Sequence, residues 1–212
     1  MDALLTLPQF ATFLAAAVLV TLAPGPDNMM ILSLGMSRGR RRGVAFGLGC
    51  ALGCINHTLL AALGISALIA ASPTAFNGLR IAGGAYLVWL GIQALRNARP
   101  LGEPRSGPSK EESPLRLFGK GLFANAINPK VILFFLAFLP QFVDGARGGI
   151  AWQITQLGIV FTAETALIFG AIGWFAGGLG EWLARRPAIG AWLDRVTGGV
   201  FIALGIRLLV VR

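Results

Sequence analysis

The sequence predicts an all-α membrane protein with six transmembrane helices. Hydrophobic residues make up 55% of the 212-residue chain and charged residues only 13%, about half of the roughly 25% that soluble domains carry. The apolar residues form long runs rather than the alternation of a β-barrel strand, which favours spanning helices. The 29 glycines suit membrane helices that pack closely. The mean hydropathy of +0.72 is too high for a water-facing globule.

Six apolar segments of roughly 20 residues each are the expected spans. They cover residues 10–36, 44–71, 79–95, 118–142, 150–179 and 196–211. The first is not expected to be a cleaved signal, because its start has no Lys or Arg and its apolar run is too long. The polar stretch 97–114 contains four prolines and is typical of a flexible loop.

The loops indicate how the chain is oriented. Thirteen of the 18 Lys and Arg residues would lie in loops on one side of the membrane, and three on the other. Cytoplasmic loops are rich in Lys and Arg, so the basic side is expected in the cytoplasm and both termini outside. Because the basic residues lie between apolar runs, the net charge of +9 is attributed to orientation rather than to nucleic acid binding.

The two halves of the chain resemble each other. Residues 80–87 (RIAGGAYL) match residues 195–202 (RVTGGVFI) at the start of the third and sixth spans. Further matches are Pro26-Asp27 with Pro129-Lys130 and His57-Thr58 with Glu164-Thr165. A repeat of three spans must insert upside down relative to its copy, and inverted repeats are typical of secondary transporters.

We therefore expect a single transmembrane transporter domain, 1–212, built from two inverted three-helix repeats. The first repeat covers about 1–96 and the second about 118–212, with a cytoplasmic linker of about 97–117 between them. Exchange of conformation between the two halves would give alternating access to a central site.

The first span is expected to break at its centre. Pro24 and Pro26 flank Gly25, and two prolines remove two backbone donors and obstruct the preceding turn. The freed backbone groups are tolerated at mid-membrane only around a polar or protein-lined cavity. Asp27 or Asn28 can cap the half-helix that follows. A simple proline kink is the alternative.

The fourth span repeats this pattern. Asn128 suits the N-cap of a half-helix and Pro129 its first position, and Lys130 follows. The N-terminus of a half-helix attracts carboxylates. Asp27 and Lys130 place opposite charges at matched positions, so they can receive the ammonium and carboxylate of a zwitterion, or they can pair with each other.

Four ionisable residues lie near the middle of spans, namely Asp27, His57, Lys130 and Glu164. Each charge costs at least about 2.5–3.5 kcal/mol there, so they should share a polar interior, either as a transport site or as ion pairs that fix helix register. His57 has an ordinary pKa of about 6.5, and it is a candidate for proton coupling together with Glu164 and Asp27. A satisfied structural histidine is the alternative for His57.

Other classes of function have less support. Cys50 and Cys54 lie on one helical face and suit packing, and we expect neither a metal site nor a cofactor, because a metal needs more ligands. A membrane enzyme is not expected, since no motif such as H-E-x-x-H occurs. Efflux of a metal ion or another toxic small solute is the alternative function, although it would favour more His, Cys or Asp. The Gly-rich faces permit a homo-oligomer.

Several motifs resemble those of the LysE/RhtB family of amino-acid exporters, and the resemblance covers nearly the whole chain. They are Ala23-Pro24-Gly25-Pro26-Asp27-Asn28 with Ser37-Arg38-Gly39, Gly121-Leu122 through Asn125, Asn128-Pro129-Lys130 through Phe138-Leu139-Pro140-Gln141-Phe142, and Gly83-Gly84-Ala85-Tyr86-Leu87 with Leu90-Gly91. The two proline motifs at this spacing are highly specific together. The family often has Asn where this chain has Asp27.

The resemblance implies proton-driven efflux of amino acids or related metabolites across the bacterial inner membrane. Homoserine, threonine, leucine, cysteine and lysine are substrates within the family. The implied partners are a small-molecule substrate, protons and the lipid bilayer. The substrate site implied by the two proline motifs comprises Pro24, Gly25, Pro26, Asp27, Asn28, Asn125, Asn128, Pro129 and Lys130.

Overall fold

The computed structural model describes residues 4–96, 112–186 and 188–210, and every regular element within these ranges is helical. The elements are α1 (Leu7–Leu22), α2 (Pro26–Arg38), α3 (Arg40–Ala71), α4 (Pro73–Arg96), α5 (Pro114–Ala126), α6 (Pro129–Leu133), the π-helix η1 (Phe134–Phe138), the 3-10 helices η2 (Leu139–Phe142) and η3 (Gly145–Arg147), α7 (Ile150–Ala184) and α8 (Ala188–Val210). The predicted all-α fold is confirmed for this part of the chain.

Three helices, α3, α4 and α7, contain stretches long and apolar enough to cross a membrane. Two bent helix pairs each qualify as one broken span: α1 and α2 meet at 58°, and α5 meets the segment Pro129–Phe142 at 50°. Both predicted helix breaks are therefore present, and the described residues contain up to five spans by length and composition. The sixth expected span, 196–211, overlaps α8, which begins eight residues earlier, carries Asp194, Arg195 and Arg207, and does not meet the same measure.

The predicted linker lies mostly outside the described residues, which resume at 112. The helix α5 begins at Pro114, so its first turn falls in the range assigned to the linker and starts four residues before the expected span. Ser113 is the cause, because its side chain caps the helix by accepting a hydrogen bond from the backbone N–H of Arg116 at 3.3 Å.

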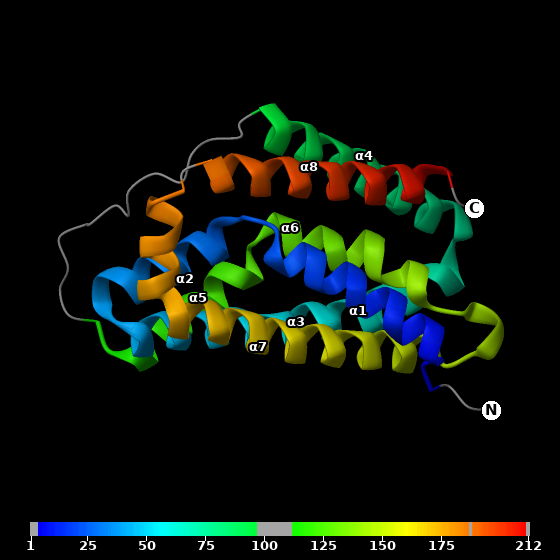
Figure 1. Cartoon of the computed structure of the whole chain (residues 1–212). Helices are drawn as coiled ribbons and strands as arrows, with labels where there is room; N and C mark the ends of the chain where they lie inside the picture. Colours follow the sequence, from blue (N-terminus) through cyan, green and yellow to red (C-terminus); the bar gives the residue numbers. More distant parts are fainter. Residues whose placement is uncertain (1–3, 97–111, 187, 211–212) are drawn as a thin grey trace.

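The helices form an elongated bundle (Figure 1). Helices α4 and α8 pair along one edge, α3 and α7 pair along the opposite edge, and α1 and α6 lie between these pairs. The beginning of α1 and the end of α8 lie at the same end of the bundle. The opposite end carries the α2–α3 corner, the start of α5 and the end of α7.

Helices α4 and α8 pack backbone against backbone. A Cβ atom on Gly91 would lie 2.6 Å from the carbonyl oxygen of Gly198, and one on Gly205 would lie 2.7 Å from that of Gly84. Because 91 meets 198 and 84 meets 205, the two helices run antiparallel. The glycines of the third predicted span are thus paired with those of the sixth.

Glycines also bring α3 and α5 into backbone contact. Gly49 faces the carbonyl oxygen of Phe118, and Gly121 faces that of Phe46, with no room for a Cβ atom at either position. Small residues of this kind allow membrane helices to approach closely. The half-helix α5 is therefore held firmly against the long helix of the other half of the chain.

An aromatic cluster fills the bundle between its centre and the end where α1 begins. Its members are Phe13, Phe134, Phe135, Phe138, Phe142 and Phe161, all of them buried. The closest rings, those of Phe134 and Phe161, have centroids 4.7 Å apart. Since Phe13 lies on α1 between its start and the proline break, the cluster separates the break from that end of the bundle.

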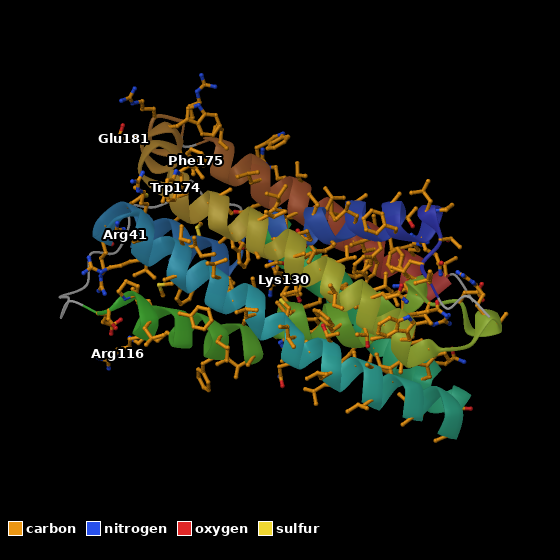
Figure 2. All side chains as sticks on the ribbon, turned by 90° about the horizontal axis from the view of Figure 1, so that it is seen from below. Arg41, Arg116, Lys130, Trp174, Phe175 and Glu181 are labelled. Atoms are coloured by element: carbon orange, nitrogen blue, oxygen red, sulfur yellow. The ribbon has the colours of Figure 1, made fainter. Side chains whose placement is uncertain are left out.

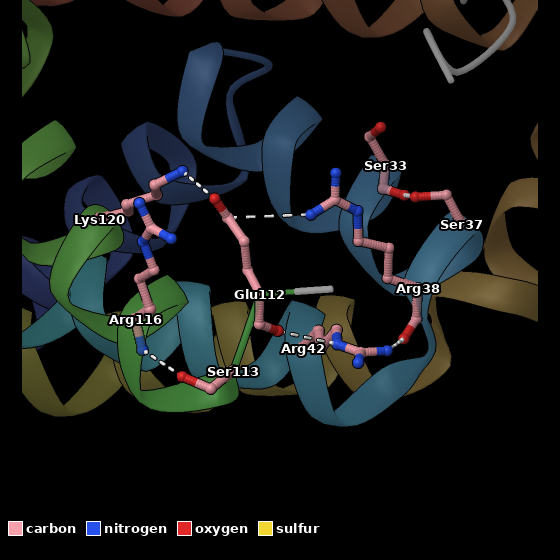
Figure 3. Close-up of polar contacts among 8 residues, drawn as sticks. All are labelled: Ser33, Ser37, Arg38, Arg42, Glu112, Ser113, Arg116 and Lys120. Atoms are coloured by element: carbon pink, nitrogen blue, oxygen red, sulfur yellow. Dashed lines mark hydrogen bonds and ion pairs between the residues drawn. The ribbon is translucent and has the colours of Figure 1, made fainter. Parts of the chain in front are cut away.

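An ion network closes the opposite, basic end (Figure 3). The carboxylate of Glu112 lies 2.6 Å from the ammonium of Lys120 and 3.8 Å from the guanidinium of Arg38. Arg42 donates a hydrogen bond of 3.2 Å to the carbonyl oxygen of Glu112. The hydrogen bond from Lys120 lowers the pKa of Glu112, so this carboxylate remains ionised at neutral pH. The network ties the α2–α3 corner to the start of α5.

Candidate functional site

The two helix breaks meet in the interior of the bundle. The side-chain amide of Asn128 donates a hydrogen bond of 2.8 Å to Oδ2 of Asp27, and each residue is only 5% exposed. Asp27 lies in the first turn of α2, and Asn128 caps α6 by accepting from the backbone N–H of Lys130 at 3.0 Å, as predicted. Figure 2 places Lys130 near the middle of the bundle and Arg41 and Arg116 at its basic end. The structure thus brings together residues 101 positions apart in sequence.

Lys130 compensates the break in the first half of the chain. Pro24 has no N–H to donate to the carbonyl oxygen of Val20, its acceptor in an unbroken helix. The ammonium of Lys130 donates to that oxygen at 3.2 Å and to the carbonyl oxygen of Ala23 at 3.1 Å. Gly25 leaves room for the ammonium, because a Cβ atom there would lie only 3.2 Å from Nζ.

Asp27 and Lys130 do not form an ion pair within 4.0 Å in this structure. The ion pairs between described residues lie at the basic end of the bundle. Asp27 acts on Lys130 only as a charged neighbour, while its carboxylate is bound by Asn128. Direct pairing of the two charges, one of the two predicted arrangements, is therefore not the one observed.

His57 plays the matching part at the second break. Pro129 cannot donate to the carbonyl oxygen of Asn125, which accepts from the backbone N–H of Asn128 at 3.0 Å, and Nε2 of His57 lies 3.1 Å from the same oxygen. A hydrogen bond between them requires the proton on Nε2. The ring is 5% exposed and packs against Phe135, with centroids 5.6 Å apart. This is the arrangement of a satisfied structural histidine, and proton transfer by His57 stays a prediction.

Asn125, which only the family resemblance indicated, is a buried anchor of α5. Its side-chain oxygen lies 3.7 Å from the thiol of Cys54, and a Cβ atom on Gly53 would lie 2.7 Å from the same oxygen. Cys50 and Cys54 are both buried free thiols. These two cysteines pack in the interior, as the sequence predicted.

A second polar cluster surrounds Glu164, which is 7% exposed. Its Oε1 accepts hydrogen bonds from the hydroxyls of Thr21 at 2.7 Å and Thr165 at 3.2 Å, whereas its Oε2 is buried without a partner. The amide of Asn28 donates to the carbonyl oxygen of Thr21 at 2.8 Å, and its Oδ1 is also buried without a partner. The Asn28 amide therefore takes a second carbonyl that the proline break leaves free.

Sequence reasoning did not single out Thr21 and Thr165. A threonine in an apolar helix usually bonds to its own backbone, so the residue type alone carries no signal of a site. The match of His57-Thr58 with Glu164-Thr165 between the two halves was the one pattern that included Thr165. Thr21 could be found only from its position near the break.

A groove of about 890 Å³ lies away from these clusters, at the basic end of the bundle. Its lining consists of Gly35, Arg40, Trp174, Phe175, Gly177, Gly178, Leu179 and Trp182. The guanidinium of Arg40 lies 4.1 Å from the centroid of the Trp174 ring. Trp and Arg together are typical of a membrane–water interface. Within residues 4–96, 112–186 and 188–210, no group of three or more His, Cys, Asp or Glu could hold a metal ion.

Asn128→Asp is expected to destabilise the protein by about 1.5–3 kcal/mol, the range of a hydrogen bond to a charged group. The substitution would place two carboxylates against each other where an amide now donates to Asp27. Adding Asp27→Asn to this variant exchanges the two groups and should restore most of the stability. Thermal unfolding of detergent-purified protein measures both effects. A double variant no more stable than Asn128→Asp would contradict the proposed contact.

Fold and site together define a helical membrane protein whose two broken helices meet at a buried polar centre. The profile of the LysE type translocator family matches residues 18–212, and the chain belongs to this family. The chain is 36% identical to an uncharacterized membrane protein of Vibrio cholerae, over 92% of this chain and 94% of the relative. It is 30% identical to the threonine efflux protein of Escherichia coli over 96% and 98%, and 29% identical to the homoserine/homoserine lactone efflux protein of Salmonella typhimurium over 98% and 99%. No solved structure matches the chain.

Proposed function

We propose that this protein is a secondary transporter of the bacterial inner membrane that exports amino acids or closely related small metabolites in exchange for protons. The observation that carries the proposal is the contact between the two helix breaks, in which Asn128 of one half binds Asp27 of the other at a buried centre. Broken helices that meet at mid-depth are the usual binding sites of secondary transporters. Relatives named for the efflux of threonine, leucine and homoserine support an amino-acid substrate.

The proposed topology is six spans in two inverted repeats, with both termini outside. Each half supplies one bent helix pair, one long helix and one glycine-rich helix in the same order. The antiparallel contacts of Gly91 with Gly198 and of Gly84 with Gly205 are what a two-fold relation between the halves would produce. The basic α2–α3 corner and the start of α5 lie at the end opposite the first turn of α1, which supports a cytoplasmic position for that end.

Lys130 is the proposed partner of the substrate carboxylate. Its ammonium donates hydrogen bonds to two carbonyl oxygens and not to a carboxylate of the protein. A substrate carboxylate can therefore replace these two acceptors without breaking an ion pair. Asn128, Asn28 and Asn125 supply amide groups at the same two breaks. Pro24, Gly25, Pro26 and Pro129 shape the site by preventing an unbroken helix at these positions.

Proton coupling is proposed for Glu164, with His57 and Asp27 as further candidate carriers. Glu164 is buried and no Lys, Arg or His pairs with it among the described residues. A buried carboxyl group without a counter-ion is typical of a proton-binding site in a membrane transporter. Glu164 is the strongest candidate of the three, because its Oε2 is buried without a hydrogen-bond partner, whereas Nε2 of His57 and Oδ2 of Asp27 are both hydrogen-bonded.

The function is tested by amino-acid release from intact cells. Cells that lack their own exporters are loaded with dipeptides of threonine, homoserine, leucine, cysteine or lysine and are then compared with and without the protein. We expect at least one amino acid to accumulate outside about tenfold faster with the protein, and we expect a protonophore to abolish this difference. Equal release with and without the protein for every amino acid would contradict the proposal.

A further inference from the structure

We propose that Glu164, Asn28, Thr21 and Thr165 form one cation site, which the ammonium of an outgoing amino acid and an incoming proton occupy in turn. The inference rests on the proposed function and names the group at which substrate and proton are exchanged. It also assigns the ammonium to Glu164 rather than to Asp27.

Two unpartnered oxygen atoms carry the proposal. Oε2 of Glu164 and Oδ1 of Asn28 are both buried without a hydrogen-bond partner. They belong to one cluster, because Thr21 donates its hydroxyl to Glu164 at 2.7 Å and accepts from Asn28 through its carbonyl at 2.8 Å. A buried polar group without a partner costs about 1–3 kcal/mol, and more if it is charged. Both free atoms are acceptors, so the missing group must donate hydrogen bonds.

Two donors relevant to the proposed function fit this requirement. A primary ammonium carries three N–H donors and can serve several oxygen atoms at once. A proton on Oε2 turns that oxygen from an acceptor into a donor, for which Asn28 Oδ1 is an unused acceptor in the same cluster. The hydroxyls of Thr21 and Thr165 hold Oε1 in both cases.

Asp27 is less suited to the ammonium. Its Oδ2 is already bound by Asn128, and this contact joins the two halves of the chain. The Glu164 cluster also lies beside Lys130, because Lys130 binds the carbonyls of Val20 and Ala23 while Thr21 binds Glu164. Both ends of a bound amino acid would therefore be received around one turn of α1.

No charged neighbour occupies the carboxyl group of Glu164, so this group is available to bind either a proton or the substrate ammonium. The other titratable side chains of the bundle centre are Cys50, Cys54 and His57 on α3, Asp27 on α2 and Lys130 on α6. The carboxylate of Glu164 acts electrostatically on the thiol of Cys54. None of these groups forms an ion pair with Glu164 within 4.0 Å, and the neighbouring helices α1 and η2 contain no titratable side chain.

Because a proton and the substrate ammonium cannot bind Glu164 at the same time, amino acid and proton must be exchanged for each other. If Glu164 binds either a proton or the ammonium, the transporter carries one of them in each direction and never both. By linkage, each ligand then weakens the other, and binding of the amino acid releases a proton from the site. One competing protonation changes the apparent affinity about tenfold per pH unit.

Calorimetric binding to purified protein in lipid nanodiscs tests the inference. The probes are L-threonine, L-homoserine, L-leucine and the 2-hydroxy acid that corresponds to leucine but lacks the ammonium, between about pH 5 and pH 8. Titration in buffers of different ionisation enthalpy gives the number of protons released. For at least one amino acid, we expect release of up to one proton and an affinity that falls as the pH is lowered through the titration of Glu164. The hydroxy acid should release none.

The variants separate the roles of the residues. Glu164→Gln keeps an oxygen for the two threonine hydroxyls and should lose at least tenfold in amino-acid affinity together with the proton release. Glu181→Gln is the matched control, because Glu181 lies on the same helix with its side chain 74% exposed, and it should change neither quantity. Asn28→Ala, which leaves both hydroxyl contacts of Glu164 intact, should weaken amino-acid binding severalfold and leave the hydroxy acid unaffected.

The outcomes distinguish this inference from the proposed function. Amino-acid binding without proton release, or a Glu164→Gln variant that keeps the wild-type pH dependence, would overturn the inference and leave export intact. If Glu164→Gln does not fold, unchanged amino-acid affinity in Asn28→Ala would overturn the inference instead. Wild-type protein that binds none of the three amino acids would count against the proposed function and the inference together.

Discussion

Lys130→Ala is expected to reduce amino-acid export by about 10- to 100-fold. The ammonium of Lys130 is the one positive charge at the two breaks among the described residues, and it is the proposed partner of the substrate carboxylate. A hydrogen bond to a charged group contributes about 1.5–3 kcal/mol, which corresponds to the stated range. Initial rates of release from dipeptide-loaded cells, normalised to the amount of protein in the membrane, measure the effect.

The same substitution has a structural cost that must be measured separately. Without Lys130, the carbonyl oxygens of Val20 and Ala23 lose their side-chain donor, and each costs about 1–3 kcal/mol if it stays buried and unpaired. Lys130→Arg keeps the charge and the donors, so it should retain more stability and more export than Lys130→Ala. Arg185→Ala is the control for the loss of a positive charge, because its side chain is 81% exposed and lies outside the Glu112 network. Export within twofold of wild type in Lys130→Ala would contradict its role.

Gly49→Ala is expected to destabilise the protein by about 3 kcal/mol or more, or to prevent folding. A Cβ atom at this position would collide with the carbonyl oxygen of Phe118, and it would lie 2.9 Å from the carbonyl carbon of that residue. Both are backbone atoms, so the clash is relieved only if α3 and α5 move apart. Overpacking of a tight interior typically costs about 1–3 kcal/mol, and more where the neighbouring atoms cannot move aside.

Gly64→Ala is the matched control on the same helix. Nothing lies within 4 Å of a Cβ atom at Gly64, and alanine is a better helix former than glycine by about 1 kcal/mol. This variant should therefore be as stable as wild type or slightly more stable. The pair Gly121→Ala and Gly119→Ala repeats the contrast on α5, where Gly121 faces Phe46 and Gly119 faces open space. Thermal unfolding in detergent measures the stability of each variant. Equal stability of Gly49→Ala and Gly64→Ala would refute the close contact between α3 and α5.

The family membership shown by the comparisons agrees with what the two proline motifs indicated. The breaks themselves were predictable because proline acts locally. It removes its own N–H and obstructs the turn before it, whatever the rest of the chain does. The half-helix start at Pro129 followed from the same argument and is present. The first half-helix starts at Pro26 with Gly25 as its N-cap, so the predicted capping by Asp27 or Asn28 was wrong, because Pro26 itself takes the first helical position.

The sequence by itself determined the helical fold, the position of both breaks and the identity of the buried charges. These features depend on hydrophobicity and on local backbone chemistry, which can be read from short windows. The two longest helices were located to within a few residues, as α3 begins at Arg40 rather than at 44 and α7 continues to Ala184 rather than ending at 179. The third and sixth spans were expected too short at their starts, since α4 begins at Pro73 rather than at 79 and α8 at Ala188 rather than at 196.

Only the tertiary structure decided which side chain hydrogen-bonds to which polar group at the two helix breaks. Lys130 takes the carbonyl that Pro24 leaves free, His57 bonds to the carbonyl of Asn125 at the second break, and Asp27 binds Asn128. Each of these contacts joins residues about 70 to 110 positions apart. They exist because glycine contacts allow α3, α5 and α7 to approach closely enough for side chains of one half to reach the backbone of the other. The hydrophobic pattern of a sequence does not predict which helices pack closely together. The hydrogen-bond partners at the two breaks and the threonines around Glu164 could therefore be assigned only from the packed structure.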